Sequence, residues 1–112
     1  SVSPVASDPS VLEVVDRTDH GVVARVSGDL DIVTSERVTT ELARLIDAGH
    51  VLVTLDVADV GFVDSSGLGA LVAVHRHAES HDGSLVLRSV PDRVRRLFEI
   101  TRLDDLLAVE GE

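Results

Sequence analysis

The sequence feature that most constrains the fold is the apolar run Val51–Val57, which reads Val-Leu-Val-Thr-Leu-Asp-Val. A short, nearly continuous run of β-branched and aliphatic residues is typical of a central strand covered on both faces. Segments with helical spacing of apolar residues precede and follow it, at Thr34–Ala48 and from Ser65 onward. An alternation of strands and helices predicts an α/β fold with crossover helices and parallel strands.

The helix expected at Thr34–Ala48 has signals at both ends. Thr34 or Ser35 can cap its start, Glu36 suits its first turn, and Gly49 fits the position after its end. Its apolar residues fall at helical spacing: Val38, Leu42, Leu45 and Ile46.

The other elements complete a single α/β domain. The valine-rich runs Val11–Val15 and Gly21–Val26 predict a hairpin, and Ser84–Leu87 predicts a strand. The second helix carries Leu68, Leu71, Val72 and His75 along one face, and a third spans Pro91–Phe98. Leu103–Val109 holds a short helical turn and an edge strand. We therefore expect the order ββαβαβα plus a short C-terminal piece, in a mixed sheet of about four to five strands packed with about four helices. Residues 11–112 form the domain, after a flexible Ser/Pro-rich tail at 1–10.

Composition excludes several classes of function. The 112 residues include 20 acids and 10 bases, a net charge of −10, so binding to nucleic acid or an anionic membrane is not expected. Cysteine is absent, which excludes disulfides and thiol chemistry, and the two aromatic residues, Phe62 and Phe98, offer no platform for stacking bases. No basic, apolar leader opens the chain and no apolar run could span a bilayer, so we expect a cytoplasmic protein.

The segment Asp64–Gly69 (Asp-Ser-Ser-Gly-Leu-Gly) carries the most specific information. An aspartate and two serines before a helix can serve as ordinary caps. Two glycines within the first turn go beyond a cap, because each costs up to about 1 kcal/mol relative to alanine. Such a cost is tolerated where something approaches the backbone closely. A hydroxyl at a helix N-terminus is also a place where an added phosphate is electrostatically tolerated.

This segment resembles the signature loop of bacterial anti-sigma factor antagonists, which are single STAS domains. Gly28–Asp31 resembles the Gly-Glu-Leu-Asp segment of that family, with Asp29 in place of the common glutamate. Val53–Asp56 with Val60–Asp64 resembles the central strand and its exit, and Val94–Glu99 resembles the third helix. The resemblance spans about residues 11 to 109, with the four segments in the expected order.

The resemblance implies a regulatory protein without cofactor, metal or catalytic residues. Its unphosphorylated form would bind an anti-sigma factor that is also a GHKL-type serine kinase, and so free a sigma factor for transcription. Phosphorylation of one loop serine would end the complex, and a PP2C-type phosphatase would reset this partner switching. The acceptor position maps onto Ser65, with Ser66 as second choice. The residues expected to face the partner are Asp29, Asp31, Asp64, Ser66, Gly67, Leu68 and Gly69.

Two chemical alternatives use the histidines. A serine hydrolase would need Ser65 or Ser66 as nucleophile with His75 or His77 as base, but the Gly-x-Ser-x-Gly pattern is absent and the histidines lie along the helix that the serines begin. A metal site could use His75, His77 and His81, with His77 and His81 four residues apart. No further ligand motif completes it, so a solvated helix end is preferred.

Two further alternatives concern the partner. Arg93, Arg95 and Arg96, with Arg88 and Arg102, form a basic cluster, but the surrounding acids favour ion pairs or an acidic protein surface over nucleic acid. STAS domains also occur in stressosomes, anion transporters and lipid-transport complexes. A stressosome-like assembly or a lipid-transport complex therefore remains the alternative setting for this fold.

Overall fold

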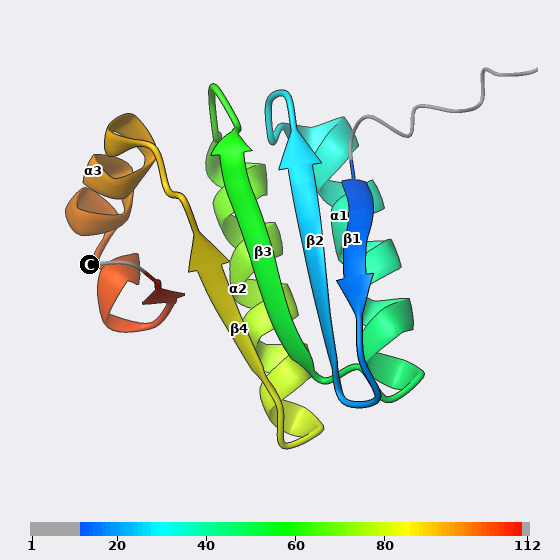
Figure 1. Ribbon diagram of the computed structural model, residues 1–112. Coiled ribbons are helices and arrows are strands. Elements are labelled where there is room, and N and C mark those ends of the chain that lie inside the picture. Colours follow the sequence, from blue (N-terminus) through cyan, green and yellow to red (C-terminus); the bar gives the residue numbers. More distant parts are fainter. Residues whose placement is uncertain (1–11, 111–112) are drawn as a thin grey trace, which may run out of the picture.

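The computed structural model describes residues 12–110 and confirms the predicted α/β order (Figure 1). One five-stranded sheet has the strand order β1-β2-β3-β4-β5. The described residues form three α-helices and one short 3₁₀-helix, close to the expected four helices. The elements are β1 (Leu12–Arg17), β2 (Gly21–Ser27), α1 (Ile32–Asp47), β3 (Leu52–Asp59), α2 (Ser65–Ser80), β4 (Ser84–Arg88), α3 (Asp92–Thr101), η2 (Leu103–Asp105) and β5 (Ala108–Val109). The expected tail at residues 1–10 lies outside the described part of the chain.

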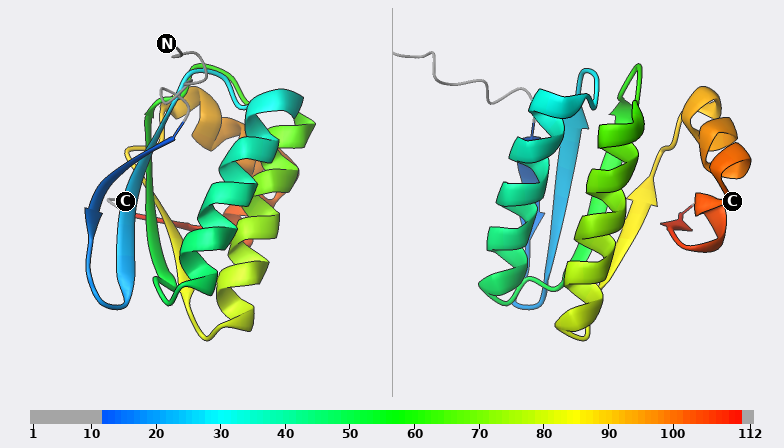
Figure 2. Two further views of the ribbon diagram at one scale, coloured as in Figure 1. Left: turned by 90° about the vertical axis from the view of Figure 1, so that its right-hand side faces the viewer. Right: turned by 180° about the vertical axis from the view of Figure 1, so that it is seen from behind.

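The sheet is mixed, as predicted. β1 and β2 form the antiparallel hairpin, whereas β2, β3, β4 and β5 are parallel neighbours. Helices α1 and α2 lie side by side on one face, and α3 with η2 lies beyond β4 at the edge of the sheet (Figures 1 and 2). The expectation of a central strand with both faces covered is therefore wrong for β3, since both long helices cover the same face.

The core lies between the sheet and the helix pair α1/α2. Residues of β2 alternate between buried and partly exposed positions, with Val22, Ala24 and Val26 buried. Val38 and Leu42 of α1 are fully buried against this face. Aliphatic side chains make up most of this core, so its stability comes from apolar burial and close packing.

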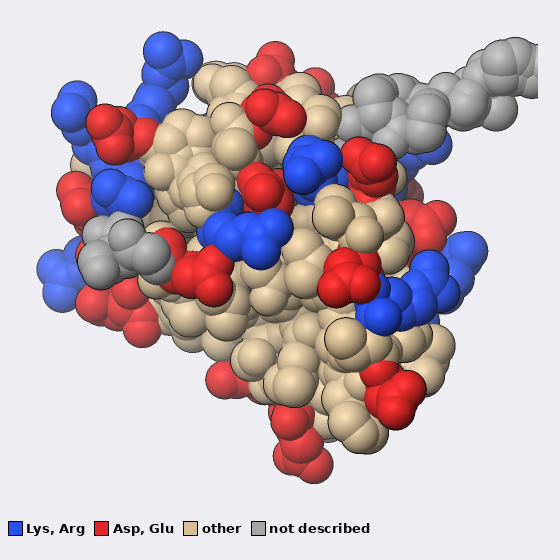
Figure 3. Space-filling view, in the orientation of Figure 1, with Lys and Arg blue, Asp and Glu red and all other residues tan. Residues whose placement is uncertain are grey.

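The second face of the sheet is open and carries charges of both signs (Figure 3). Glu13, Arg25, Asp56 and Arg88 stand in register across four neighbouring strands. Arg25 Nη1 lies 3.6 Å from Glu13 Oε1, and Arg88 Nη2 lies 3.5 Å from Asp56 Oδ2. Asp56, a charged residue within the apolar run of β3, therefore forms an ion pair with Arg88 on the neighbouring strand β4.

The start of α1 differs from the prediction. Asp31 is the N-cap, accepting hydrogen bonds from the backbone N–H groups of Val33 and Thr34, while the Thr34 hydroxyl accepts one from the Asp31 N–H. The prediction of a Thr34 or Ser35 cap is wrong because this reciprocal capping box starts the helix earlier. Glu36 consequently lies beyond the first turn. Gly49 follows the C-cap with φ +111°, as its predicted position after the helix requires.

The other helices differ in detail from the prediction. In α2, Leu71 and His75 are buried as expected, whereas Val72 is only partly buried and Val74 takes its place in the core. In α3, Pro91 is the N-cap and the helix continues to Thr101, three residues beyond the predicted end. Small residues such as Ala70 and Ala78 contribute to the buried face of α2. For this reason the pattern of large apolar residues in the sequence did not show which side of the helix is buried.

Candidate functional site

Two loops that are far apart in the sequence are joined at the carboxyl ends of β2 and β3. Leu30 and Val63 form an isolated parallel bridge. The Leu30 N–H donates to Phe62 O at 2.8 Å, and the Asp64 N–H donates to Leu30 O at 3.1 Å. These bonds extend the pairing of the two strands into the loops that lead to α1 and α2, at the upper end of the molecule in Figure 2. The Gly28–Asp31 segment and the signature loop therefore form one surface.

The first residues of α2 present one serine to solvent and turn the other toward α1. Asp64 is the N-cap, and its Oδ1 accepts a hydrogen bond from the Gly67 N–H at 2.9 Å. Ser65 is the first helical residue and is exposed, whereas Ser66 is partly buried. Ser66 lines a groove with Ser35 and Thr39 of α1. Of the two serines, Ser65 is therefore the more exposed to solvent.

The two glycines of the loop have different roles. Gly67 is buried, and a Cβ atom there would lie 2.6 Å from Leu30 O and 2.8 Å from Val63 Cγ1. At Gly69, which is exposed, a Cβ atom would meet nothing within 4 Å. The prediction that another group lies close to the backbone of this segment is thus confirmed at Gly67. The group is Leu30, which belongs to the loop before α1 of the same chain. Gly67 has a packing role, which leaves Gly69 and the partly buried Leu68 as the residues that can form the surface.

The predicted acidic residues surround the helix start, but not all are free for a partner. The Asp31 carboxylate caps α1, and the hydrogen bond from the Thr34 backbone N–H is the main cause that holds the pKa of Asp31 below its ordinary value. Asp64 similarly caps α2. Asp29 is exposed beside Gly61, so it is the predicted carboxylate most available to another molecule.

Exposed apolar side chains around this surface were missed in the sequence. Phe62 is 52% exposed, and Ile32 and Val33, at the start of α1, are 71% and 67% exposed. Solvent-exposed apolar residues that cluster beside a polar loop indicate a protein-binding surface. An aromatic residue two positions before Asp64 was the available signal, but the sequence alone did not show that it points outward.

Helix α3 borders the same surface. Arg93 Nη1 donates to Gly61 O at 3.2 Å, which ties the start of α3 to the loop before α2. Phe62, Arg93, Leu97 and Ile100 line a shallow pocket of about 240 Å³ together with Val63, Val94 and Arg96. This pocket places α3 next to the signature loop, although about thirty residues separate them in the chain.

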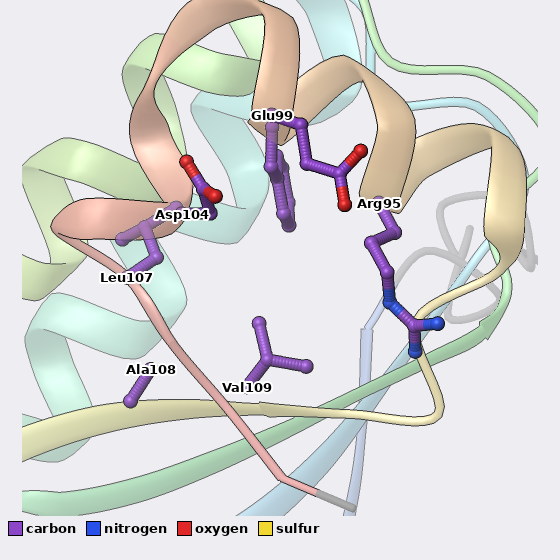
Figure 4. Close-up of a pocket in the computed structure, with 7 residues that line it drawn as sticks. Arg95, Glu99, Asp104, Leu107, Ala108 and Val109 are labelled. Atoms are coloured by element: carbon purple, nitrogen blue, oxygen red, sulfur yellow. The ribbon is translucent and has the colours of Figure 1, made fainter. Parts of the chain in front are cut away.

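A second pocket, of about 430 Å³, lies between α3, η2 and β5 (Figure 4). Arg95 and Glu99 come from α3, Asp104 from η2, and Val109 from β5. None of the residues expected to face the anti-sigma factor lines this pocket.

The structure gives the serine hydrolase alternative little support. His75 Nε2 lies 3.3 Å from Glu79, and His77 Nε2 lies 2.7 Å from Asp47, both remote from the serines at the other end of α2. Neither histidine is therefore placed to activate Ser65 or Ser66. In the basic cluster, Arg88, Arg95 and Arg102 each lie within 4 Å of an aspartate, as the expectation of local ion pairs required.

Among residues 12–110, no helix has both the length and the apolar character needed to cross a membrane.

Comparisons with known proteins show the family to which the chain belongs. The STAS domain family model matches residues 11–111. The anti-sigma-B factor antagonist of Listeria monocytogenes is 34% identical over 105 residues, covering 90% of this chain and 91% of that protein. The protein of the same name from Bacillus subtilis is 28% identical and covers 88% of this chain and 89% of its own length.

Solved structures share the fold. An anti-sigma factor antagonist from Mycobacterium paratuberculosis aligns with a TM-score of 0.75 at 22% identity, covering 95% of this chain and 91% of that chain. The Bacillus cell fate determinant SpoIIAA in its phosphorylated form aligns with a TM-score of 0.70 at 22% identity, covering 90% and 92%. The relatives' names are those of regulatory binding proteins rather than enzymes. By its family model and by its curated relatives, the chain belongs to the STAS-domain family of anti-sigma factor antagonists.

Proposed function

We propose that this protein is a cytoplasmic anti-sigma factor antagonist controlled by phosphorylation of Ser65. In the unphosphorylated form it binds an anti-sigma factor that is also a GHKL-type serine kinase, which frees the sigma factor. Phosphate on Ser65 dissociates this complex, and a PP2C-type phosphatase restores binding. Ser66 is the second choice for the acceptor. The names of the curated relatives support the antagonist role.

The observation that carries the proposal is the position of Ser65. Its exposed hydroxyl opens α2 on a surface built from both signature segments, with Asp29 and the exposed Phe62 nearby. Ser66 is partly buried in the groove between α1 and α2, so its hydroxyl is less accessible. A kinase supplies its own base, Mg²⁺ and ATP, so an accessible hydroxyl is the main requirement of the acceptor.

Charge explains how one phosphate can act as a switch. It adds about −1.5 to −2 charges at pH 7. In the uncomplexed protein, the N-terminus of α2 offsets part of that charge, while the Asp64 carboxylate at the same helix end opposes it. The net effect on the free fold is therefore small. In the complex, the same charge would be desolvated against the partner, and about 3 kcal/mol of mismatch would weaken binding roughly a hundredfold.

The partner surface combines this charge-sensitive loop with apolar anchors. Phe62 and Ile100 line the shallow pocket beside the loop, and Ile32 is exposed at the start of α1. Exposed aromatic and aliphatic groups supply affinity, whereas the polar loop supplies specificity and control. The contact roles of Asp29, Asp31, Asp64, Ser66, Leu68 and Gly69 belong to this proposal.

The test combines phosphate mapping with binding. The protein is incubated with its cognate anti-sigma kinase and ATP, and the modified residue is identified by mass spectrometry. Phosphate is expected on Ser65 and absent in Ser65→Ala, with Ser66→Ala as the matched control that remains modified. Phosphate that persists in Ser65→Ala and disappears in Ser66→Ala would move the site to Ser66.

The binding arm separates charge from shape. Ser65→Asp should bind the anti-sigma factor at least tenfold more weakly than Ser65→Asn, which has nearly the same size and no charge. Ser65→Ala should bind tightly and stay bound when ATP is added. Equal affinities for Ser65→Asp and Ser65→Asn would refute the electrostatic switch.

A further inference from the structure

We propose that Asp47, His77 and His81 form a binding site for a divalent transition-metal cation of the Zn²⁺ class. One ligand atom from each residue lies within 4.8 Å of the other two. The site joins the C-terminal ends of α1 and α2, at the opposite end of α2 from Ser65. It is independent of the partner-binding surface proposed above.

The structure brings in a ligand that the histidine spacing alone did not indicate. Asp47 is the last residue of α1, and His81 is the C-cap of α2. The sequence pointed to His75, His77 and His81, but His75 is buried and faces Glu79 instead. The packing of α1 against α2 therefore changes the expected ligand set: the exposed carboxylate of Asp47 takes the place of the buried His75.

The three groups converge on one point. His77 Nε2 and His81 Nε2 lie 2.7 and 3.4 Å from the same oxygen, Asp47 Oδ1. The two imidazole rings are tilted by 58°, with their centres 4.9 Å apart, so they do not stack on each other. Zn–N and Zn–O bonds of about 2.0–2.2 Å place neighbouring ligand atoms about 3.3 Å apart in a tetrahedron. The distance from His81 Nε2 to Asp47 Oδ1 already matches this spacing, whereas His77 Nε2 would move outward from Asp47 Oδ1 when a cation binds.

The donor set and its surroundings suit a borderline cation. Two neutral imidazoles and one carboxylate are ligands that Zn²⁺ and related ions accept, with water in the remaining position. The ends of two helices meet here, and the partial negative charge of their C-terminal carbonyl groups favours a cation. With the net charge of −10, the chain as a whole also attracts cations.

The side chains remain accessible to a cation from solvent. The side chain of Asp47 is 60% exposed, and those of His77 and His81 are 35% and 40% exposed. Because the metal would bridge two helices of the folded state, it should stabilise that state against unfolding. Substituting these exposed residues should leave the fold intact, which makes the site testable by mutation.

The experiment titrates ZnCl₂ into the full chain, without a purification tag, by calorimetry and thermal unfolding. We expect one ion per chain with micromolar or tighter affinity, and a rise in Tm that EDTA reverses. Asp47→Asn and His77→Gln should each weaken binding at least tenfold, and the double substitution His77→Gln with His81→Gln should abolish it. His20→Gln, which changes an exposed histidine outside the cluster, should bind like the original protein.

Two results would overturn the site. One is the absence of saturable Zn²⁺ binding below millimolar concentration. The other is equal binding by the double variant, whose folding is checked by circular dichroism. Either would leave Asp47, His77 and His81 as an ordinary surface cluster that holds no metal ion.

Discussion

Leu30 lies directly over the backbone of Gly67, with its carbonyl oxygen and Cβ atom where a side chain at position 67 would begin. The same carbonyl oxygen accepts a hydrogen bond from the Asp64 N–H. Leu30 is itself almost fully buried, at 1% exposure. The loop before α1 and the start of α2 are therefore one packed unit, and Ser65 is held on its surface by contacts within the protein.

Gly67→Ala should lower the free energy of unfolding by about 1–3 kcal/mol, the usual range for forcing an extra group into a packed site. The new Cβ atom would lie 2.6 Å from a backbone oxygen that is fixed by its hydrogen bond to Asp64. Urea unfolding monitored by circular dichroism measures the effect. Gly69→Ala is the matched control, since its Cβ atom enters open space and alanine favours the helix by up to about 1 kcal/mol. Equal losses in both variants would contradict the close packing of Leu30 on Gly67.

The cap at Asp31 predicts a specific pH dependence. The hydrogen bonds from Thr34 and Val33 lower the pKa of Asp31, so the charged carboxylate favours the folded state. A lowered pKa contributes stability above the ordinary aspartate value of about 4, and this contribution is lost as the pH falls through the folded-state pKa. Asp31→Asn should therefore have a lower Tm at pH 7, and the difference should shrink steadily below about pH 4.

The control for this measurement is Asp29→Asn, which removes the same charge from the exposed neighbour. Its Tm difference from the original protein should be smaller at pH 7. A Tm gap for Asp31→Asn that stays constant from pH 7 to pH 3 would show that the lost carboxylate charge is not the cause.

The end of α3 offers a stabilising substitution. Arg102 is its C-cap and has a left-handed backbone, with φ 65° and ψ 19°. That conformation costs a residue with a Cβ atom about 1–2 kcal/mol, and glycine avoids the cost. Arg102→Gly should raise the free energy of unfolding by about 1 kcal/mol, since its exposed ion pair with Asp105 contributes little. Ala48→Gly, at the right-handed C-cap of α1, should not stabilise the protein. A gain at Ala48 equal to that at Arg102 would rule out the conformational explanation.

The order of the strands and helices could be predicted because local signals agree with the fold. The apolar run around Leu55 and the helical spacing of Val38 and Leu42 indicate their elements without tertiary information. The face of the sheet that each helix covers could not be predicted. The apolar residues of a strand do not show on which side of the sheet the helix that connects it to the next strand will pack. Asp56 shows the difficulty: it is polar yet only 8% exposed, because a neighbouring strand provides Arg88.

The candidate site was predictable where it depends on the signature loop and not where it depends on contacts between distant segments. Asp64, Ser65 and Gly67 stand next to one another in the sequence, and the glycines signal a close approach. The partner of Gly67 was unknown, since only the fold brings Leu30 to it. Asp47 was missed for the same reason, because nothing in the sequence relates the end of α1 to His77.

Phe62→Ser should weaken binding to the anti-sigma factor without a matching loss of stability. Phe62 is half exposed on the rim of the pocket that α3 forms beside the signature loop. Aromatic anchors near the centre of an interface contribute about 2 kcal/mol or more, so the expected loss in affinity is about thirtyfold. Leu52→Ser is the matched control, because Leu52 is 49% exposed at the amino end of β3, away from the loop. Calorimetric titration with the anti-sigma factor measures both variants, and thermal unfolding confirms that each is folded. If the two variants bind equally well, Phe62 lies outside the interface.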